Sequence, residues 1–83
     1  MAEGNWKMIP VIVTWNDAWG SDGECDVTKL DHKPYLTKSV GWLLRSDDVG
    51  VTIAMDLFPD EPTTFKNNAF LPHGMIVDIV ELN

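Results

Sequence analysis

Two tryptophans and a few cations are the residues through which this chain could bind a ligand. Trp15 ends a β-branched run, and Trp19 follows four residues later in a segment rich in glycine and aspartate. An indole at the root of a loop can stack on a nucleobase, which contributes about 1–3 kcal/mol per base. The same pair could instead pin the loop onto the domain, and the sequence leaves these two interpretations open.

The cations are scarce in an acidic chain. Six lysines and arginines stand against 13 acidic residues, for a net charge of −7. An acidic protein that binds an anionic ligand must focus its few cations at one place, and arginine suits bidentate contact with phosphate. Solvated lysines are the plainer interpretation of each cation alone. The predicted ligand-binding residues are Trp15, Asp17, Trp19, Lys29, His32, Lys33, Lys38 and Arg45.

No combination of residues indicates catalysis. Cys25 lies between Glu24 and Asp26, whose negative charges should raise the thiol pKa and weaken it as a nucleophile. His32 and His73 have no neighbours in a catalytic spacing, and no glycine-rich phosphate loop is present. We therefore expect a protein that is not an enzyme, with no catalytic residues and no cofactor.

Four carboxylates within ten residues raise the question of a metal site. Hard cations favour such oxygen clusters, but the spacing does not fit the calcium-binding loop pattern. The carboxylates are Asp17, Asp22, Glu24 and Asp26. Solvated loop charge is the favoured interpretation, so no metal is expected.

Composition predicts one small domain over residues 1–83. A chain of this size buries a small core, and the single Cys25 excludes an intrachain disulfide, so a homo-oligomer is expected. The acidic balance argues against direct nucleic-acid binding. No apolar run is long enough for a membrane span, and a lone cysteine fits a reducing compartment, so a cytoplasmic location without membrane contact is expected.

Short runs of β-forming residues predict an all-β fold. A turn at residues 46–50 joins two of the runs into a hairpin, whose second strand is expected to place Val51, Ile53, Met55 and Leu57 on one face. In the last strand Ile76, Val80 and Leu82 are expected to share a face. The predicted strands cover residues 6–15, 39–46, 50–58, 63–71 and 75–82. Residues 16–38 are predicted to be a long functional loop, with or without one helical turn at 27–32 capped by Asp26.

Three motifs are similar to a pattern found in small bacteriophage proteins with an SH3-like barrel. They are Trp15-Asn16-Asp17-Ala18, Ser39-Val40-Gly41-Trp42-Leu43-Leu44 and Leu71-Pro72-His73-Gly74-Met75-Ile76. This resemblance implies a small five-stranded SH3-like barrel with a long first loop, in which Trp42 is a core residue. Leu71 and His73 depart from the pattern, which usually has isoleucine and often lysine there.

The resemblance also suggests a function. Small oligomeric phage proteins of this design include anti-defence sponges that sequester nucleotide immune signals in the host cytoplasm. We therefore expect a non-enzymatic phage anti-defence protein that binds and sequesters a small anionic ligand. A nucleotide immune signal is the first candidate for this ligand. One alternative is an acidic inhibitor that occupies a basic site on a host nucleic-acid-binding or defence protein. Another is a structural or adaptor barrel.

Overall fold

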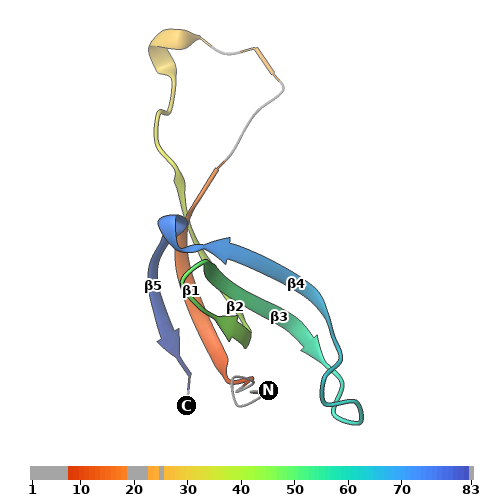
Figure 1. The fold of residues 1–83 in the computed structure, drawn as a ribbon. Helices are drawn as coiled ribbons and strands as arrows, with labels where there is room; N and C mark the ends of the chain where they lie inside the picture. Colours follow the sequence, from red (N-terminus) through yellow and green to blue (C-terminus); the bar gives the residue numbers. More distant parts are fainter. Residues whose placement is uncertain (1–7, 19–22, 25, 83) are drawn as a thin grey trace.

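The described part of the chain contains five β-strands and two single-turn 3₁₀ helices (Figure 1). The computed structural model describes residues 8–18, 23–24 and 26–82. The elements in chain order are β1 (Pro10–Asp17), η2 (Val27–Lys29), β2 (Tyr35–Ser46), β3 (Gly50–Leu57), β4 (Phe65–Pro72), η3 (His73–Met75) and β5 (Ile76–Glu81). No helix among the described residues has the length and apolar character needed to cross a membrane.

The strands form one antiparallel sheet in the order β4-β3-β2-β1-β5. The first four strands follow one another as a meander, and η3 then carries the chain back so that β5 pairs with β1. This confirms the predicted all-β fold of five strands. The two edges of the sheet are β4 and β5.

Strand β2 is long because it serves two partners in succession. Pairing with β1 runs from Tyr35 to Trp42, and pairing with β3 runs from Trp42 to Ser46, with a register shift around Leu44. At Gly41 the backbone of β2 lies close to residues of β3. A Cβ atom there would stand 2.9 Å from the Ala54 carbonyl oxygen and 3.2 Å from the Cβ of Ile53. The absence of a side chain at Gly41 therefore allows β2 to lie this close to β3.

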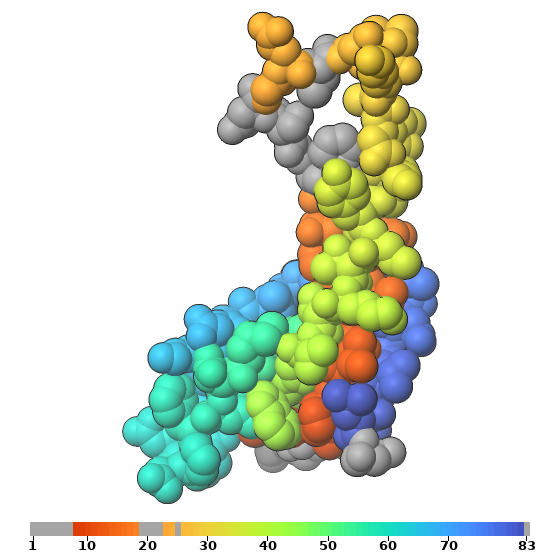
Figure 2. Space-filling view, turned by 180° about the vertical axis from the view of Figure 1, so that it is seen from behind, coloured from red at the N-terminus to blue at the C-terminus, as the bar shows by residue number. Residues whose placement is uncertain are grey.

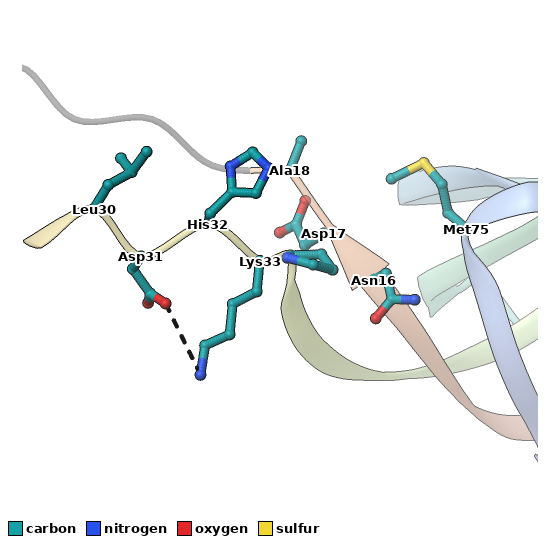
Figure 3. A pocket seen from close by; sticks show the side chains of 9 residues that line it. Asn16, Asp17, Ala18, Leu30, Asp31, His32, Lys33 and Met75 are labelled. Carbon is teal, nitrogen blue, oxygen red and sulfur yellow. Dashed lines mark ion pairs between the residues drawn. The ribbon is translucent and has the colours of Figure 1, made fainter. Parts of the chain in front are cut away.

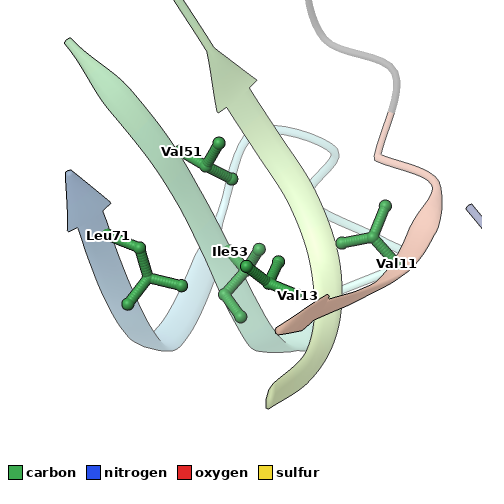
Figure 4. Close-up of a cluster of buried hydrophobic side chains, with 5 residues drawn as sticks. All are labelled: Val11, Val13, Val51, Ile53 and Leu71. Carbon is green, nitrogen blue, oxygen red and sulfur yellow. The ribbon is translucent and has the colours of Figure 1, made fainter. Parts of the chain in front are cut away.

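The core is small and centred on three strands. Val11 and Val13 from β1 meet Val51 and Ile53 from β3, and Leu71 of β4 closes one side (Figure 4). Val11 and Val13 of β1, like Val51 and Ile53 of β3, are two residues apart and so lie on the same face of their strand. Complete burial of a valine or isoleucine side chain stabilises a fold by about 1.5–3 kcal/mol, so these few residues supply much of the driving force.

A two-stranded arm projects from the sheet (Figures 1 and 2). We use "arm" for residues 15–17 of β1, residues 35–37 of β2, and the described residues between them. The molecule measures 52 × 24 × 23 Å, and its radius of gyration is 16.1 Å. A compact domain of this length would have a radius of gyration of about 12 Å. The predicted loop 16–38 therefore contains the last two residues of β1 and the first four of β2.

The 3₁₀ turn η2 lies within the predicted helical turn at 27–32 and is shorter than that range. Asp26 is its N-cap, as predicted, and accepts a hydrogen bond from the Thr28 backbone N–H at 3.0 Å. The Thr28 N–H, followed by its hydroxyl, lowers the pKa of the Asp26 carboxyl. Local capping thus forms where the sequence indicated it, although the turn is fully exposed.

Three predicted side-chain orientations were wrong. Trp42 is 37% exposed, because the alternation of β2 turns Gly41 and Leu43 inward. Met55 is exposed, because β3 has parted from β2 beyond Ala54 and no longer faces the core. In β5 the register shift near Trp15 turns Ile79 inward and leaves Val80 48% exposed.

Replacement of Gly41 by alanine tests whether the close approach of β2 to β3 requires a residue without a side chain. The new methyl group would press on the Ala54 carbonyl and on Ile53, neither of which can move freely. We expect Gly41→Ala to lower the free energy of unfolding by about 1–3 kcal/mol, measured by urea denaturation. Gly74→Ala is the matched control, because nothing lies within 4 Å of its Cβ position, and it should change stability by less than about 0.5 kcal/mol. Equal effects of the two substitutions would contradict this account of Gly41.

Candidate functional site

A pocket lies at the base of the arm, where the chain leaves β1 and returns towards β2 (Figure 3). Its volume is about 510 Å³, within the range of small-molecule sites. Nine residues line it: Asn16, Asp17, Ala18, Leu30, Asp31, His32, Lys33, Pro34 and Met75. The walls therefore come from the end of β1, from the segment before β2, and from η3.

The pocket mixes apolar walls with groups that donate and accept hydrogen bonds. Asp31 and Lys33 form an exposed ion pair with 4.0 Å between Oδ1 and Nζ (Figure 3). Such exposed pairs contribute little to stability, so the lysine can exchange partners at small cost. Asn16 and His32 add an amide and an imidazole. The site can thus contact both a polar edge and an apolar ring of a ligand.

Three of the eight predicted ligand residues meet at this pocket. Asp17, His32 and Lys33 line it, although Asp17 is distant in the sequence from the adjacent His32 and Lys33. The pairing of Asp17 with Tyr35 across the arm explains this, because it brings the end of β1 beside the segment that precedes β2.

Trp15 and Lys38 do not line the pocket and contact other parts of the sheet. The Trp15 ring is half-buried against the core, and its Nε1–H donates to the Ser39 hydroxyl at 3.0 Å. Lys38 Nζ donates to the Thr14 hydroxyl at 3.0 Å on the neighbouring strand. Both side chains tie β1 to β2, which favours the interpretation of Trp15 as a residue that anchors the loop.

Arg45 lies near the end of β2, just before the turn to β3, and does not line the pocket. Its Nε donates to Asp47 Oδ2 at 2.9 Å. Asp47 also accepts hydrogen bonds from the backbone N–H groups of Val49 and Gly50, which lower its carboxyl pKa more than Arg45 does. The Asp47 carbonyl contacts the His73 ring, so this turn is also joined to η3. The structure thus gives Arg45 a place in a turn network.

The remaining predicted residues do not add to the pocket. Lys29 is exposed in η2 and is not one of the lining residues. Trp19 lies outside the described residues, as does Cys25. No group of three or more His, Cys, Asp or Glu side chains among the described residues is arranged to hold a metal ion.

Several lining residues were missed from the sequence. Asn16 had a usable signal, because it lies beside Asp17 at the predicted end of a strand. Leu30 and Pro34 looked like ordinary loop residues. Met75 belongs to η3, which is distant in the sequence from the other lining residues, and only the return of β5 to β1 brings it near.

Comparison with protein-family models, curated proteins and solved structures found no match to this chain. The resemblance to small phage proteins therefore stays a prediction that rests on the three motifs.

The turn network predicts a pH dependence. Because the folded-state pKa of Asp47 lies below the usual value of about 3.9, its carboxylate stabilises the fold above about pH 4. That contribution is lost as the pH falls through the folded-state pKa. We expect Asp47→Ala to lower the melting temperature at pH 7, and the difference from the wild type to shrink under acid conditions.

Asp48→Ala is the control for this experiment, because Asp48 is an exposed neighbour in the same turn. It should leave the melting temperature close to that of the wild type at both pH values. A difference between wild type and Asp47→Ala that stays constant down to pH 2 would argue against the carboxylate as the cause.

Proposed function

We propose that this protein is a non-enzymatic binding protein that takes up a small ligand in the pocket at the base of the arm. The convergence of Asp17, His32 and Lys33 in one pocket supports this proposal. Binding requires such a constellation of polar groups but no nucleophile or general base in reaction geometry.

The lining narrows the chemistry of the ligand. Two carboxylates, Asp17 and Asp31, stand against Lys33 and His32, so the pocket is poorly suited to a highly charged anion. A ligand with one anionic group, an apolar ring and an edge of donors and acceptors fits better. The amide of Asn16 and the Asp17 carboxylate can read such an edge, and Leu30, Pro34 and Met75 offer apolar contact.

Cyclic mononucleotides, which carry a single phosphodiester charge, meet this description, whereas cyclic dinucleotides carry two such charges. The resemblance to phage proteins makes cyclic nucleotide immune signals the first ligands to screen, and sequestration of such a signal is the proposed activity. A sponge of this kind would hold its ligand unaltered and keep it from a host receptor.

A thermal-shift panel of cyclic mononucleotides, cyclic dinucleotides and nucleosides tests the proposal. A ligand at one hundred times its Kd stabilises the folded state by about 2.7 kcal/mol, so one member should raise the melting temperature by several degrees. We expect His32→Ala and Lys33→Ala to lose this shift while melting normally without ligand, because both residues are exposed.

Lys66→Ala is the matched control, since Lys66 is exposed on β4 and does not line the pocket; it should keep the full shift. The ligand recovered after heat denaturation should be chemically unchanged. A cleaved product would show an enzyme, and a panel without any shift would reject the proposed ligand class.

A second function, binding to a protein partner, is favoured by the exposed apolar side chains of the arm. Val27 is 79% exposed and Leu36 is 67% exposed, and Leu30 and Tyr35 are exposed as well. Among the described residues of the arm, four acidic residues stand against two lysines. An apolar arm edged with negative charge suits a basic site on another protein.

Substitutions on the arm distinguish the two functions. If the arm binds a protein, Val27→Asp and Leu36→Asp should abolish capture of a basic protein from a bacterial lysate while His32→Ala leaves it intact. If the pocket alone is functional, the two arm variants should keep the nucleotide-induced thermal shift, and no partner should be captured by the wild type.

A further inference from the structure

One side of the β5-β1-β2 sheet carries an apolar surface open to solvent. We call this side the outer face; it consists of three cross-strand rows set by the pairing of the strands. The rows are Asp78–Thr14–Lys38, Val80–Ile12–Val40 and Leu82–Pro10–Trp42. In Figure 2, β2, β1 and β5 are visible next to one another in yellow-green, orange and dark blue.

The exposure of these side chains is unusual for the solvent side of an antiparallel sheet, where polar residues are expected. Val40 is 53% exposed and Val80 is 48% exposed, and both flank Ile12 directly. Trp42 and Leu82 are also exposed, on either side of Pro10. The middle and last rows thus form one continuous apolar patch across three strands, which is typical of an interaction surface.

The charges of the outer face are balanced, in contrast to those of the whole chain. Among its nine residues, only Lys38 and Asp78 are charged, and they lie at opposite ends of one row with Thr14 between them. The chain as a whole carries a net charge of −7. A surface free of net charge can approach an identical surface without the repulsion that the rest of the molecule would cause.

We propose that the outer face binds a second copy of this chain, forming a two-fold symmetric dimer. A two-fold axis parallel to β1, between two sheets packed face to face, sets β2 of each copy over β5 of the other. Lys38 of one copy then faces Asp78 of the other, twice. Val40 meets Val80 and Trp42 meets Leu82 in the same way, and Ile12 meets its own counterpart. The reversed order of charge along one row is the self-complementarity that such an interface requires.

The size of the face predicts a dimer of modest affinity. Three strands cover about 14 Å, and the five residues from Pro10 to Thr14 cover about 17 Å along β1. The nominal area of about 240 Å² per copy is well below the roughly 800 Å² that each partner buries in a standard interface, which is the range of weak, transient complexes. We therefore expect a dimer that dissociates on dilution. The pocket residues are not part of the outer face, so this inference does not depend on the proposed function.

Sedimentation equilibrium of the full chain over a series of concentrations tests the proposal. The wild type should pass from monomer to dimer within the series. Lys38→Asp and Asp78→Lys each replace two attractive contacts by two repulsive ones, and each should weaken the dimer by roughly tenfold. The combined variant Lys38→Asp/Asp78→Lys exchanges the charges and should restore the affinity of the wild type.

Two further variants separate loss of the interface from loss of the fold. Val40→Asp adds a charge within the patch and should give a folded monomer, checked by circular dichroism. Val49→Asp is the matched control, because Val49 is exposed in the turn between β2 and β3 and should leave the dimer intact. A wild type that stays monomeric throughout, or a combined variant as weak as the single ones, would overturn the proposal.

Discussion

The close approach of β2 to β3 at Gly41 is the constraint on which the rest of the structure depends. Since β2 pairs first with β1 and then with β3, it joins the two halves of the sheet around the core. This close approach requires a residue without a side chain. A register shift near Leu44 follows in the pairing of β2 with β3. From this arrangement follow the positions of β4 at one edge and of β5 at the other.

Much of the fold could be predicted because alternation and turn residues act locally. The hairpin of β2 and β3 formed where Asp47 and Gly50 indicated a turn, and Asp26 caps the 3₁₀ turn as expected. The predictions that failed concern side-chain orientation, which is decided by strand alternation at Trp42, by the end of the β2–β3 pairing at Met55 and by a register shift at Val80. One extra residue reverses which side chains face the core, as Ile79 and Val80 show, and such a shift depends on a partner strand far away in the sequence.

The candidate site was predictable in part for a similar reason. Asp17, His32 and Lys33 stood out by residue type, and the closing of the arm by Asp17 and Tyr35 brought them together. Arg45 and Trp15 stood out equally, but hydrogen bonds to Asp47 and Ser39 engage them elsewhere. Residue type suggests which side chains can bind, whereas strand pairing decides which of them share a pocket.

The arm has a consequence for how the protein can change over time. Beyond Trp15, which packs against the core and pairs with Ile76 of β5, the arm contains two paired strand ends with no third strand paired to them among the described residues. Lengthening a flexible loop twofold costs only about 0.6 kcal/mol. Insertions and deletions between β1 and β2 are therefore nearly neutral for the sheet, so the tip of the arm can diversify in length and composition while the scaffold beneath it stays the same.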